Sequence, residues 1–162
     1  MLPIDNTTRF ILNAASKLAI GNLTPVFGYN GLGEFVFNRT YARGGESWGD
    51  VVIRNIEGVM TFRKCYALSR GLQFDEAYHQ QYASEMANSM FAMEWLPPGR
   101  GLWMMGTDFA YERGATALNN CAFTDTTNDV VHSATWAMDL LMHGCGVGFT
   151  TGWVGLPYAN VP

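Results

Sequence analysis

Two adjacent prolines divide the sequence into two parts with different patterns. Pro97 and Pro98 cannot continue a helix, because proline lacks the backbone N–H and disfavours helical geometry at the residue before it. Gly99 and Gly101 follow at once, and we expect them to allow a tight turn around Arg100. The prolines therefore predict the end of a helical region and the start of another kind of structure.

The part before the prolines has the periodicity of two long helices. Ser47 is a plausible N-cap for a helix over residues 48–69, and Gly71 follows its end. Its expected inward positions are Trp48, Val52, Ile56, Val59, Phe62 and Tyr66. A second helix is predicted to begin near Asp75 and to run antiparallel to the first. We interpret its stripe of Tyr78, Tyr82, Met86, Met90 and Met93 as core packing.

The first 45 residues carry weaker signals. A short helix capped by Thr7 or Thr8 and stopped by Gly21 would place apolar residues on one face, namely Phe10, Ile11, Ala14, Ala15 and Leu18. Residues 22–45 are rich in Gly, Asn and aromatic residues and have no helical period. They predict an extended, irregular segment.

Beyond the prolines, residues 102–126 favour loop and short strands. A third helix is expected to begin after Thr127 or Asn128 and to stop at Gly144. Its expected inward residues are Val130, Val131, Ala134, Ala137, Met138, Leu141 and Met142. Residues 147–151 resemble a buried strand. The whole pattern is mixed α/β and helix-rich.

Charge and composition limit the classes of function. The net charge is -4 and the ten Lys and Arg are scattered, so no basic patch favours nucleic-acid binding. No apolar stretch reaches the roughly 18 residues that span a bilayer, and the N-terminus has no signal-peptide pattern. Three widely spaced cysteines do not form a disulfide framework. We therefore expect a cytoplasmic protein that contacts neither nucleic acid nor membrane.

The glycines at 144, 146 and 148 do not match a dinucleotide-binding loop. Such a loop follows a strand and opens a helix, whereas these glycines follow a predicted helix and precede a strand. A metal site built from Cys121, His132, His143 and Cys145 lacks any CxxC or HExxH spacing, so we predict none. His79 and His132 are most simply polar positions on helix surfaces.

The three cysteines differ in their surroundings. Cys65 lies inside a predicted helix and is expected to be a small buried hydrophobe. Cys145 lies between glycines, where either exposure or tight packing is plausible. Cys121 follows two asparagines on a predicted strand. Its reactivity depends on an environment that the sequence alone does not reveal.

Five segments together resemble a known family. Residues 39–43, 46–48, 97–103, 120–123 and 144–149 closely resemble, in order, the N-terminal part of the monomeric, adenosylcobalamin-dependent (class II) ribonucleoside-triphosphate reductases. The resemblance implies a helical N-terminal region over residues 1–95, followed over residues 96–162 by the opening strands of an incomplete ten-stranded α/β barrel. It extends over about residues 34–149, most of the chain.

The resemblance also implies a function. The family replaces the ribose 2′-hydroxyl of a ribonucleotide by hydrogen for DNA synthesis, using a cysteine thiyl radical and a reducing cysteine pair. Cys121 occupies the position of the first member of that pair, and Cys145 is not assigned the radical. The residues expected to contact substrate are Asn120, Ala122, Gly144, Gly146 and Gly148. A disulfide formed at Cys121 would need a thioredoxin-like dithiol as reductant.

The family's radical cysteine, the partner of Cys121 and a catalytic carboxylate lie well beyond residue 162. Adenosylcobalamin would be bound mainly there. The resemblance thus predicts that this chain is inactive alone, dissolves poorly, and needs a second chain that completes the barrel and binds ribonucleoside triphosphate with it. Two alternatives remain open: a non-catalytic nucleotide- or partner-binding remnant of the fold, and a fragment of a class I (diiron) large subunit.

Overall fold

The computed structural model describes residues 4–127 and 129–150. The chain divides into two compact units, Met1–Glu112 and Arg113–Pro162. Helices dominate the first unit, and the second contains a two-stranded parallel sheet, which confirms the expected mixed, helix-rich class. No helix in the described part of the chain is long and apolar enough to span a membrane.

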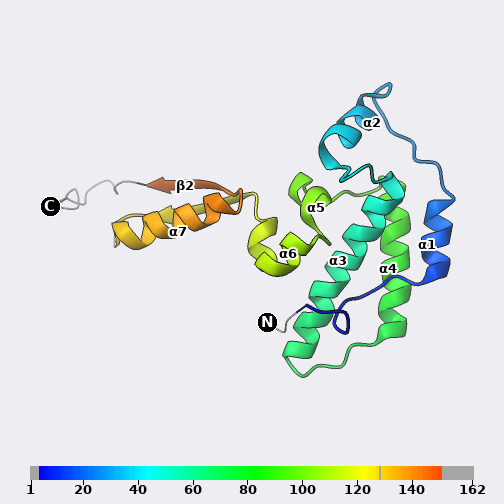
Figure 1. Cartoon of the computed structure of the whole chain (residues 1–162), viewed down its shortest axis with the longest axis horizontal. Coiled ribbons are helices and arrows are strands. Elements are labelled where there is room, and N and C mark those ends of the chain that lie inside the picture. Colours follow the sequence, from blue (N-terminus) through cyan, green and yellow to red (C-terminus); the bar gives the residue numbers. More distant parts are fainter. Residues whose placement is uncertain (1–3, 128, 151–162) are drawn as a thin grey trace. The chain divides into compact units, whose positions relative to one another are not determined.

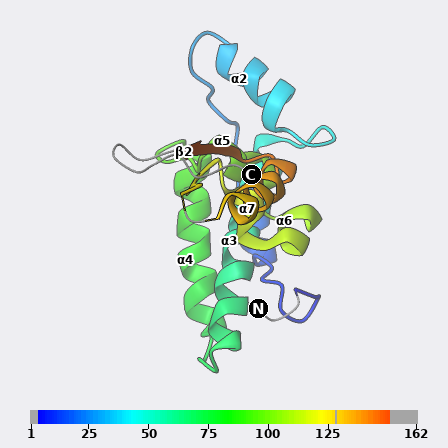
Figure 2. The same ribbon diagram turned by 90° about the vertical axis from the view of Figure 1, so that its left-hand side faces the viewer.

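The first unit is built on an antiparallel pair of helices, α3 (Trp48–Ser69) and α4 (Glu76–Phe91). They lie side by side in both views (Figures 1 and 2). Ser47 caps α3 in a capping box with Asp50, and Asp75 caps α4. Local capping chemistry sets both starts, and both predicted helices are confirmed.

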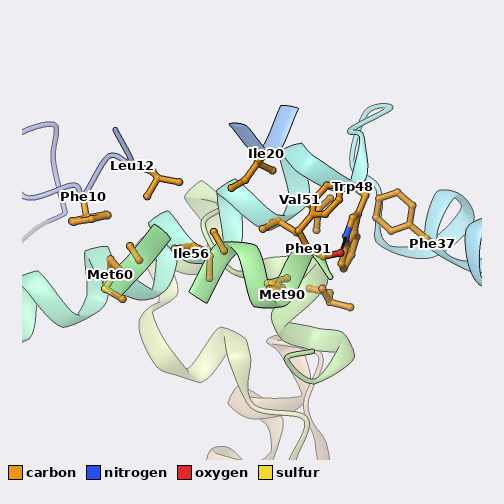
Figure 3. Packing of buried hydrophobic residues seen from close by; sticks show 14 residues of the cluster. Phe10, Leu12, Ile20, Phe37, Trp48, Val51, Ile56, Met60, Met90 and Phe91 are labelled. Carbon is orange, nitrogen blue, oxygen red and sulfur yellow. Dashed lines mark hydrogen bonds between the residues drawn. The ribbon is translucent and has the colours of Figure 1, made fainter. Parts of the chain in front are cut away.

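The core of the first unit lies between these helices and the segments that cross them (Figure 3). Trp48 is its largest member, and its indole Nε1 donates a hydrogen bond to the carbonyl of Phe91 at 3.0 Å. Burying an indole requires such a partner for its N–H. The buried cluster comprises Phe10, Leu12, Ile20, Phe37, Trp48, Val51, Val52, Ile56, Met60, Ala83, Ala87, Met90, Phe91 and Leu102.

The predicted inward faces of α3 and α4 are confirmed in part: Trp48, Val52, Ile56 and Met90 are buried, as is Cys65. The three tyrosines predicted to face inward, Tyr66, Tyr78 and Tyr82, are exposed, whereas His79 is buried. His79 is not on the surface as predicted, because its ring stacks on Phe74 at 3.9 Å and Nδ1 lies 2.6 Å from the carbonyl of Asp75. These partners satisfy a polar ring inside the core. On α4 the buried positions include the smaller residues Ala83 and Ala87.

The first helix, α1 (Ala14–Gly21), is shorter than predicted and is capped by Asn13. The prediction of a cap at Thr7 or Thr8 was wrong, whereas the stop at Gly21 is confirmed. The residues before α1 cross α3 and α4 in extended form. Their backbone N–H groups donate to side chains of those helices: Phe10 to Thr61 at 3.0 Å, Leu12 to Glu57 at 2.9 Å and Asn13 to Gln80 at 2.9 Å. These bonds replace the bonds of a helix.

The segment over residues 22–45 is not wholly irregular, contrary to the prediction. It contains α2 (Leu32–Val36) and a π-helical turn, η1 (Phe37–Tyr41). Phe37 is buried between Phe27 and Trp48, with both ring centroids 5.4 Å away. One anchored aromatic ring therefore stabilises a short helix whose sequence has no apolar period.

Helices replace the predicted turn and the loop or strands expected as far as residue 118, whereas a strand is confirmed at Cys121–Asp125. The helical segments are α5 (Gly99–Met104), α6 (Asp108–Arg113) and the 3₁₀ turn η2 (Gly114–Leu118). Gly99 and Gly101 allow neighbouring groups to pack closely, and they do not form the predicted turn. A Cβ at Gly99 would lie 2.9 Å from the hydroxyl of Tyr41, and one at Gly101 would lie 3.0 Å from Cβ of Pro97.

The second unit contains strand β1 (Cys121–Asp125), helix α7 (Val130–Met142) and strand β2 (Gly146–Thr150). The strands are parallel, as a helical crossover requires. Asp129 caps α7, so the predicted cap at Thr127 was wrong; Asn128 and Thr151 lie outside the described residues. Gly144 has a φ of 79° and ends α7 as predicted.

The buried face of α7 is narrower than predicted. Ser133, Ala137 and Leu140 are its buried residues. Of the seven positions predicted to face inward, only Ala137 does so, because two strands cover only one side of the helix. β2 is likewise exposed along much of its length and not buried as expected.

Candidate functional site

The candidate site is the face of the two-stranded sheet opposite α7. Side chains alternate between the two faces of a strand. Along β1, Cys121, Phe123 and Asp125 are exposed, whereas Ala122 and Thr124 are partly buried. The Cys121 thiol therefore projects from the open face of the sheet.

Two glycines of β2 lie beside the exposed residues of β1. Cys121 is opposite Gly146, and Phe123 is opposite Gly148. A Cβ at Gly148 would contact the Phe123 ring at 3.6 Å, and one at Gly146 would contact the carbonyl of Asn120 at 3.6 Å. Without those side chains, the backbone of β2 is open next to the thiol. A ligand on this face has access to both.

The three cysteines of the chain are free, and they differ sharply in access. Cys121 is exposed, whereas Cys65 is 0% and Cys145 is 2% exposed. Cys145 follows the end of α7, where its N–H donates to the carbonyl of Leu140 at 3.0 Å. Its role is therefore packing and capping of the helix end. Cys121 is the one thiol of the three that an outside molecule can reach.

Short hydrogen bonds hold the strands and helix together. Thr126 donates from its backbone N–H at 3.3 Å and from its hydroxyl at 2.6 Å to the carbonyl of Thr150. The Ser133 hydroxyl donates to the carbonyl of Asp125 at 2.6 Å. The Thr127 hydroxyl and backbone N–H lower the pKa of Asp125, because both donate to its carboxylate. These contacts fix the carboxyl ends of β1 and β2 together.

The structure brings together only part of the predicted site. Cys121, Gly146 and Gly148 share the open face, and Asn120 precedes them with its carbonyl accepting from the N–H of Gly146 at 2.9 Å. Ala122 is on the opposite face, and Gly144 lies at the end of α7. Ala122 therefore points away from the face that carries the thiol, and Gly144 is not part of the sheet.

Sequence reasoning missed Phe123. Its ring is 63% exposed on the same face as Cys121 and Gly148. The alternation of the strand that contains Cys121 was the available signal, because residue i+2 shares the face of residue i. The ring supplies an apolar wall next to the glycine backbone.

The open face is suited to thiol chemistry. An exposed thiol can donate a proton, and two thiols together can supply two electrons by forming a disulfide. Within residues 4–127 and 129–150, no three His, Cys, Asp or Glu side chains are grouped so as to hold a metal ion.

Comparison with known families gives a match over the first unit. Residues 16–107 match the family described as ribonucleotide reductase alpha domain. The matched region includes the helix pair α3–α4 and helix α5.

Related proteins match most of the chain. An adenosylcobalamin-dependent ribonucleoside-triphosphate reductase from Euglena gracilis is 38% identical over 94% of this chain. A probable enzyme of the same description from Dictyostelium discoideum is 37% identical over 77% of it. The chain spans only 22% and 18% of the lengths of these two relatives.

A solved structure matches the fold. The crystal structure of a B-12 dependent (class II) ribonucleotide reductase superposes with a TM-score of 0.75 over 90% of this chain and 23% of its own, at 24% sequence identity. The arrangement of helices and strands described above is therefore similar to a segment of that structure.

Proposed function

The chain belongs to the ribonucleotide reductase alpha-domain family, and we propose that it supplies a redox-active cysteine to an adenosylcobalamin-dependent ribonucleoside-triphosphate reductase. The proposal depends mainly on one observation: Cys121 is an exposed thiol beside a strip of side-chain-free backbone on a parallel strand pair. The names of the two relatives support the reaction type. The chain would form the helical N-terminal region and the opening strands of the α/β barrel.

The reaction proposed for the whole enzyme is balanced. A ribonucleoside triphosphate and two thiols give a 2′-deoxyribonucleoside triphosphate, one disulfide and water. The C2′–O bond breaks, a C2′–H bond forms, and the two thiols lose the two electrons that the sugar gains. Cys121 is one of these thiols.

Cys121 acts as acid and reductant together. Its proton moves to the leaving 2′-hydroxyl, which then departs as water, and its sulfur becomes half of the disulfide. The backbone at Gly146 and Gly148 lets the ribose approach the sulfur without a side chain between them. Asn120 borders the same edge, whereas Ala122 and Gly144 would contribute only through the backbone.

The second cysteine of the pair comes from outside residues 4–150. Cys65 and Cys145 are both buried, and Cys145 is held against the end of α7. Neither sulfur is available to a substrate on the open face of the sheet. A second part of the enzyme, in the same or another chain, therefore supplies the partner thiol and the rest of the barrel.

Adenosylcobalamin would supply the radical that starts the reaction. We assign its binding mainly to the rest of the enzyme, because the chain spans only 22% of the length of the Euglena gracilis relative. The role of Cys121 as acid and reductant does not require this chain to hold the cofactor.

The disulfide at Cys121 must be reduced again between turnovers. Exchange requires that a dithiol protein of the thioredoxin type attack the sulfur directly, and the exposure of Cys121 provides that access. The three free cysteines suit the reducing cytoplasm.

A chimeric enzyme tests the proposal. In the Euglena gracilis relative, the segment that matches this chain is replaced by the chain itself. The chimera should reduce CTP in the presence of adenosylcobalamin and dithiothreitol. Cys121→Ser should lower kcat on the order of a thousandfold or more, because the reaction loses a residue that acts as part of a unit.

Cys145→Ala is the matched control. It removes a thiol that is 2% exposed and should leave kcat within about tenfold of the parent, because its role is packing. A chimera that folds but does not turn over, or equal losses in the two variants, would contradict the proposal.

A further inference from the structure

A shallow pocket of about 540 Å³ lies on the first unit. Its lining residues are Arg39, Thr40, Ala42, Arg43, Gly44 and Trp103. They come from η1, the loop that follows it, and α5. The pocket thus combines two guanidinium groups with the edge of an indole that is 42% exposed.

The walls of the pocket are fixed by the core beneath them. Buried Phe37 anchors η1. The absence of a side chain at Gly99 lets α5 lie against Tyr41. The Arg43 side chain lies over the Trp103 ring, 5.6 Å from its centroid, and Nη1 donates to the carbonyl of Trp103 at 3.4 Å. A ligand would therefore meet an Arg43 side chain already held against Trp103, which lowers the ordering cost of binding.

The nearest carboxylate along the loop belongs to Glu46, which already forms an ion pair with another arginine, Arg54. Arg54 donates from Nε to one carboxylate oxygen at 2.7 Å and from Nη2 to the other at 2.9 Å. The same carboxylate accepts the backbone N–H of Arg43 at 3.0 Å. This bidentate pair shapes the loop and leaves the Arg43 guanidinium without competition from Glu46.

The positive charge of the pocket comes from a few neighbouring arginines and not from the chain as a whole. Among the ion pairs of residues 4–127 and 129–150, none involves Arg39 or Arg43. Arg100 adds a third guanidinium near the same indole, 5.9 Å from the ring centroid. The chain as a whole carries a net charge of -4, so this concentration of positive charge does not follow from its composition.

We infer that the pocket lined by Arg39, Arg43 and Trp103 binds the oligophosphate group of a nucleotide. Guanidinium groups match phosphate oxygens with paired N–H donors. Two such groups around one pocket suit an anion with several charges better than a single carboxylate. The space is in the range of small-ligand clefts. This inference does not depend on the proposed reductase role, because no residue near Cys121 takes part in it.

Calorimetric titration of the 162-residue chain tests the inference with three probes: inorganic triphosphate, ATP and adenosine. Triphosphate and ATP should bind with affinities within about threefold of each other, and adenosine should not bind, because the phosphates carry the interaction. Amide resonances of Gly44 and Gly45 and the indole resonance of Trp103 should shift on binding.

The variant Arg39→Gln/Arg43→Gln should weaken triphosphate binding about tenfold or more, since charge-assisted hydrogen bonds are lost. Arg63→Gln is the matched control. It removes the same kind of charge from an exposed position on α3, where Arg63 lies over Tyr82 at 5.8 Å. It should change the affinity less than twofold. Circular dichroism establishes that each variant is folded.

Several results would overturn the inference. Absence of saturable triphosphate binding excludes the site. Equal weakening by Arg63→Gln indicates a diffuse response to charge. Binding of adenosine, or of ATP but not triphosphate, indicates recognition of the base. All of these results are independent of CTP reduction by the chimera, so failure here and failure of the reductase role are distinguishable.

Discussion

At the scale of residues, the same chemical group has different roles in different surroundings. Cys65 packs inside α3, Cys145 closes the end of α7, and Cys121 is exposed on β1. The sequence neighbours differ, with asparagines before Cys121 and glycines on both sides of Cys145, but they do not reveal which sulfur is exposed. The burial of each sulfur does distinguish them.

Thiol alkylation measures this difference directly. Under native conditions iodoacetamide should modify Cys121 first, and Cys65 and Cys145 should react only as the protein opens, because buried thiols are protected by the free energy of opening. Peptide mass spectrometry over a time course gives the three rates. Modification of Cys145 as fast as Cys121 would contradict the assignment.

Tyr111 gives a second prediction at this scale. Burial raises its pKa above the ordinary value of 10.0, because desolvation disfavours the phenolate. The folded state therefore holds the proton more tightly than the unfolded state above pH 10, and the free energy of unfolding falls as the pH rises through that range. Tyr111→Phe should reduce this fall. Urea unfolding at pH 8 and at pH 10.5 measures it, and an unchanged pH dependence would count against the desolvation.

At the scale of elements, the sequence predicts those whose signals are local. The capped ends and apolar period of α3 and α4 act within each helix, so both were predicted. The extended segment before α1 was not predicted, because it is held by hydrogen bonds to the side chains of Thr61 and Glu57, which are distant in sequence. α5 was mistaken for a turn because the glycines that favour turns also allow helices to approach closely.

The candidate site, too, could be predicted from the sequence only in part. The sequence predicts that Cys121 lies on a strand, and the structure confirms this. The sequence could not show which face the thiol occupies, or that Ala122 lies on the other face. Face and register depend on the pairing of β1 with β2 across a helical crossover. The pocket at Arg43 was also missed, because its walls come from segments distant in sequence.

The close packing of α3 against the chain after α5 leads to a prediction at the scale of elements. A Cβ at Gly58 would lie 2.5 Å from the backbone N of Gly106, whereas one at Gly21 would have nothing within 4 Å. Gly58→Ala should therefore lower the free energy of unfolding by about 1 to 3 kcal/mol through overpacking. Gly21→Ala should change it by less than about 0.5 kcal/mol. Equal effects in urea unfolding would contradict the contact.

At the scale of the whole molecule, the two units differ in how much apolar surface they cover. The first unit has a continuous buried cluster. In the second, α7 leaves large side chains exposed, including Met138 and Met142, and the sheet has only two strands. Two strands and one helix bury little, so their stability is marginal unless further structure covers them.

Hydrogen exchange tests this difference. Amides of β1 and β2 should exchange on the order of tenfold faster or more than those in the middle of α3, because local opening costs less free energy in the second unit. In the chimera with the rest of the reductase, protection of β1 and β2 should rise. Equal protection of both units in the isolated chain would contradict the difference in burial.

The central claim is that Cys121 is oxidised during reduction of a nucleotide, and a single turnover measures this. The chimera is reduced, freed of dithiol and mixed with adenosylcobalamin and CTP, and its peptides are mapped by mass spectrometry without reduction. The account predicts a disulfide that joins Cys121 to a cysteine outside this chain, formed in proportion to the dCTP produced. Production of dCTP while Cys121 remains a free thiol would contradict it.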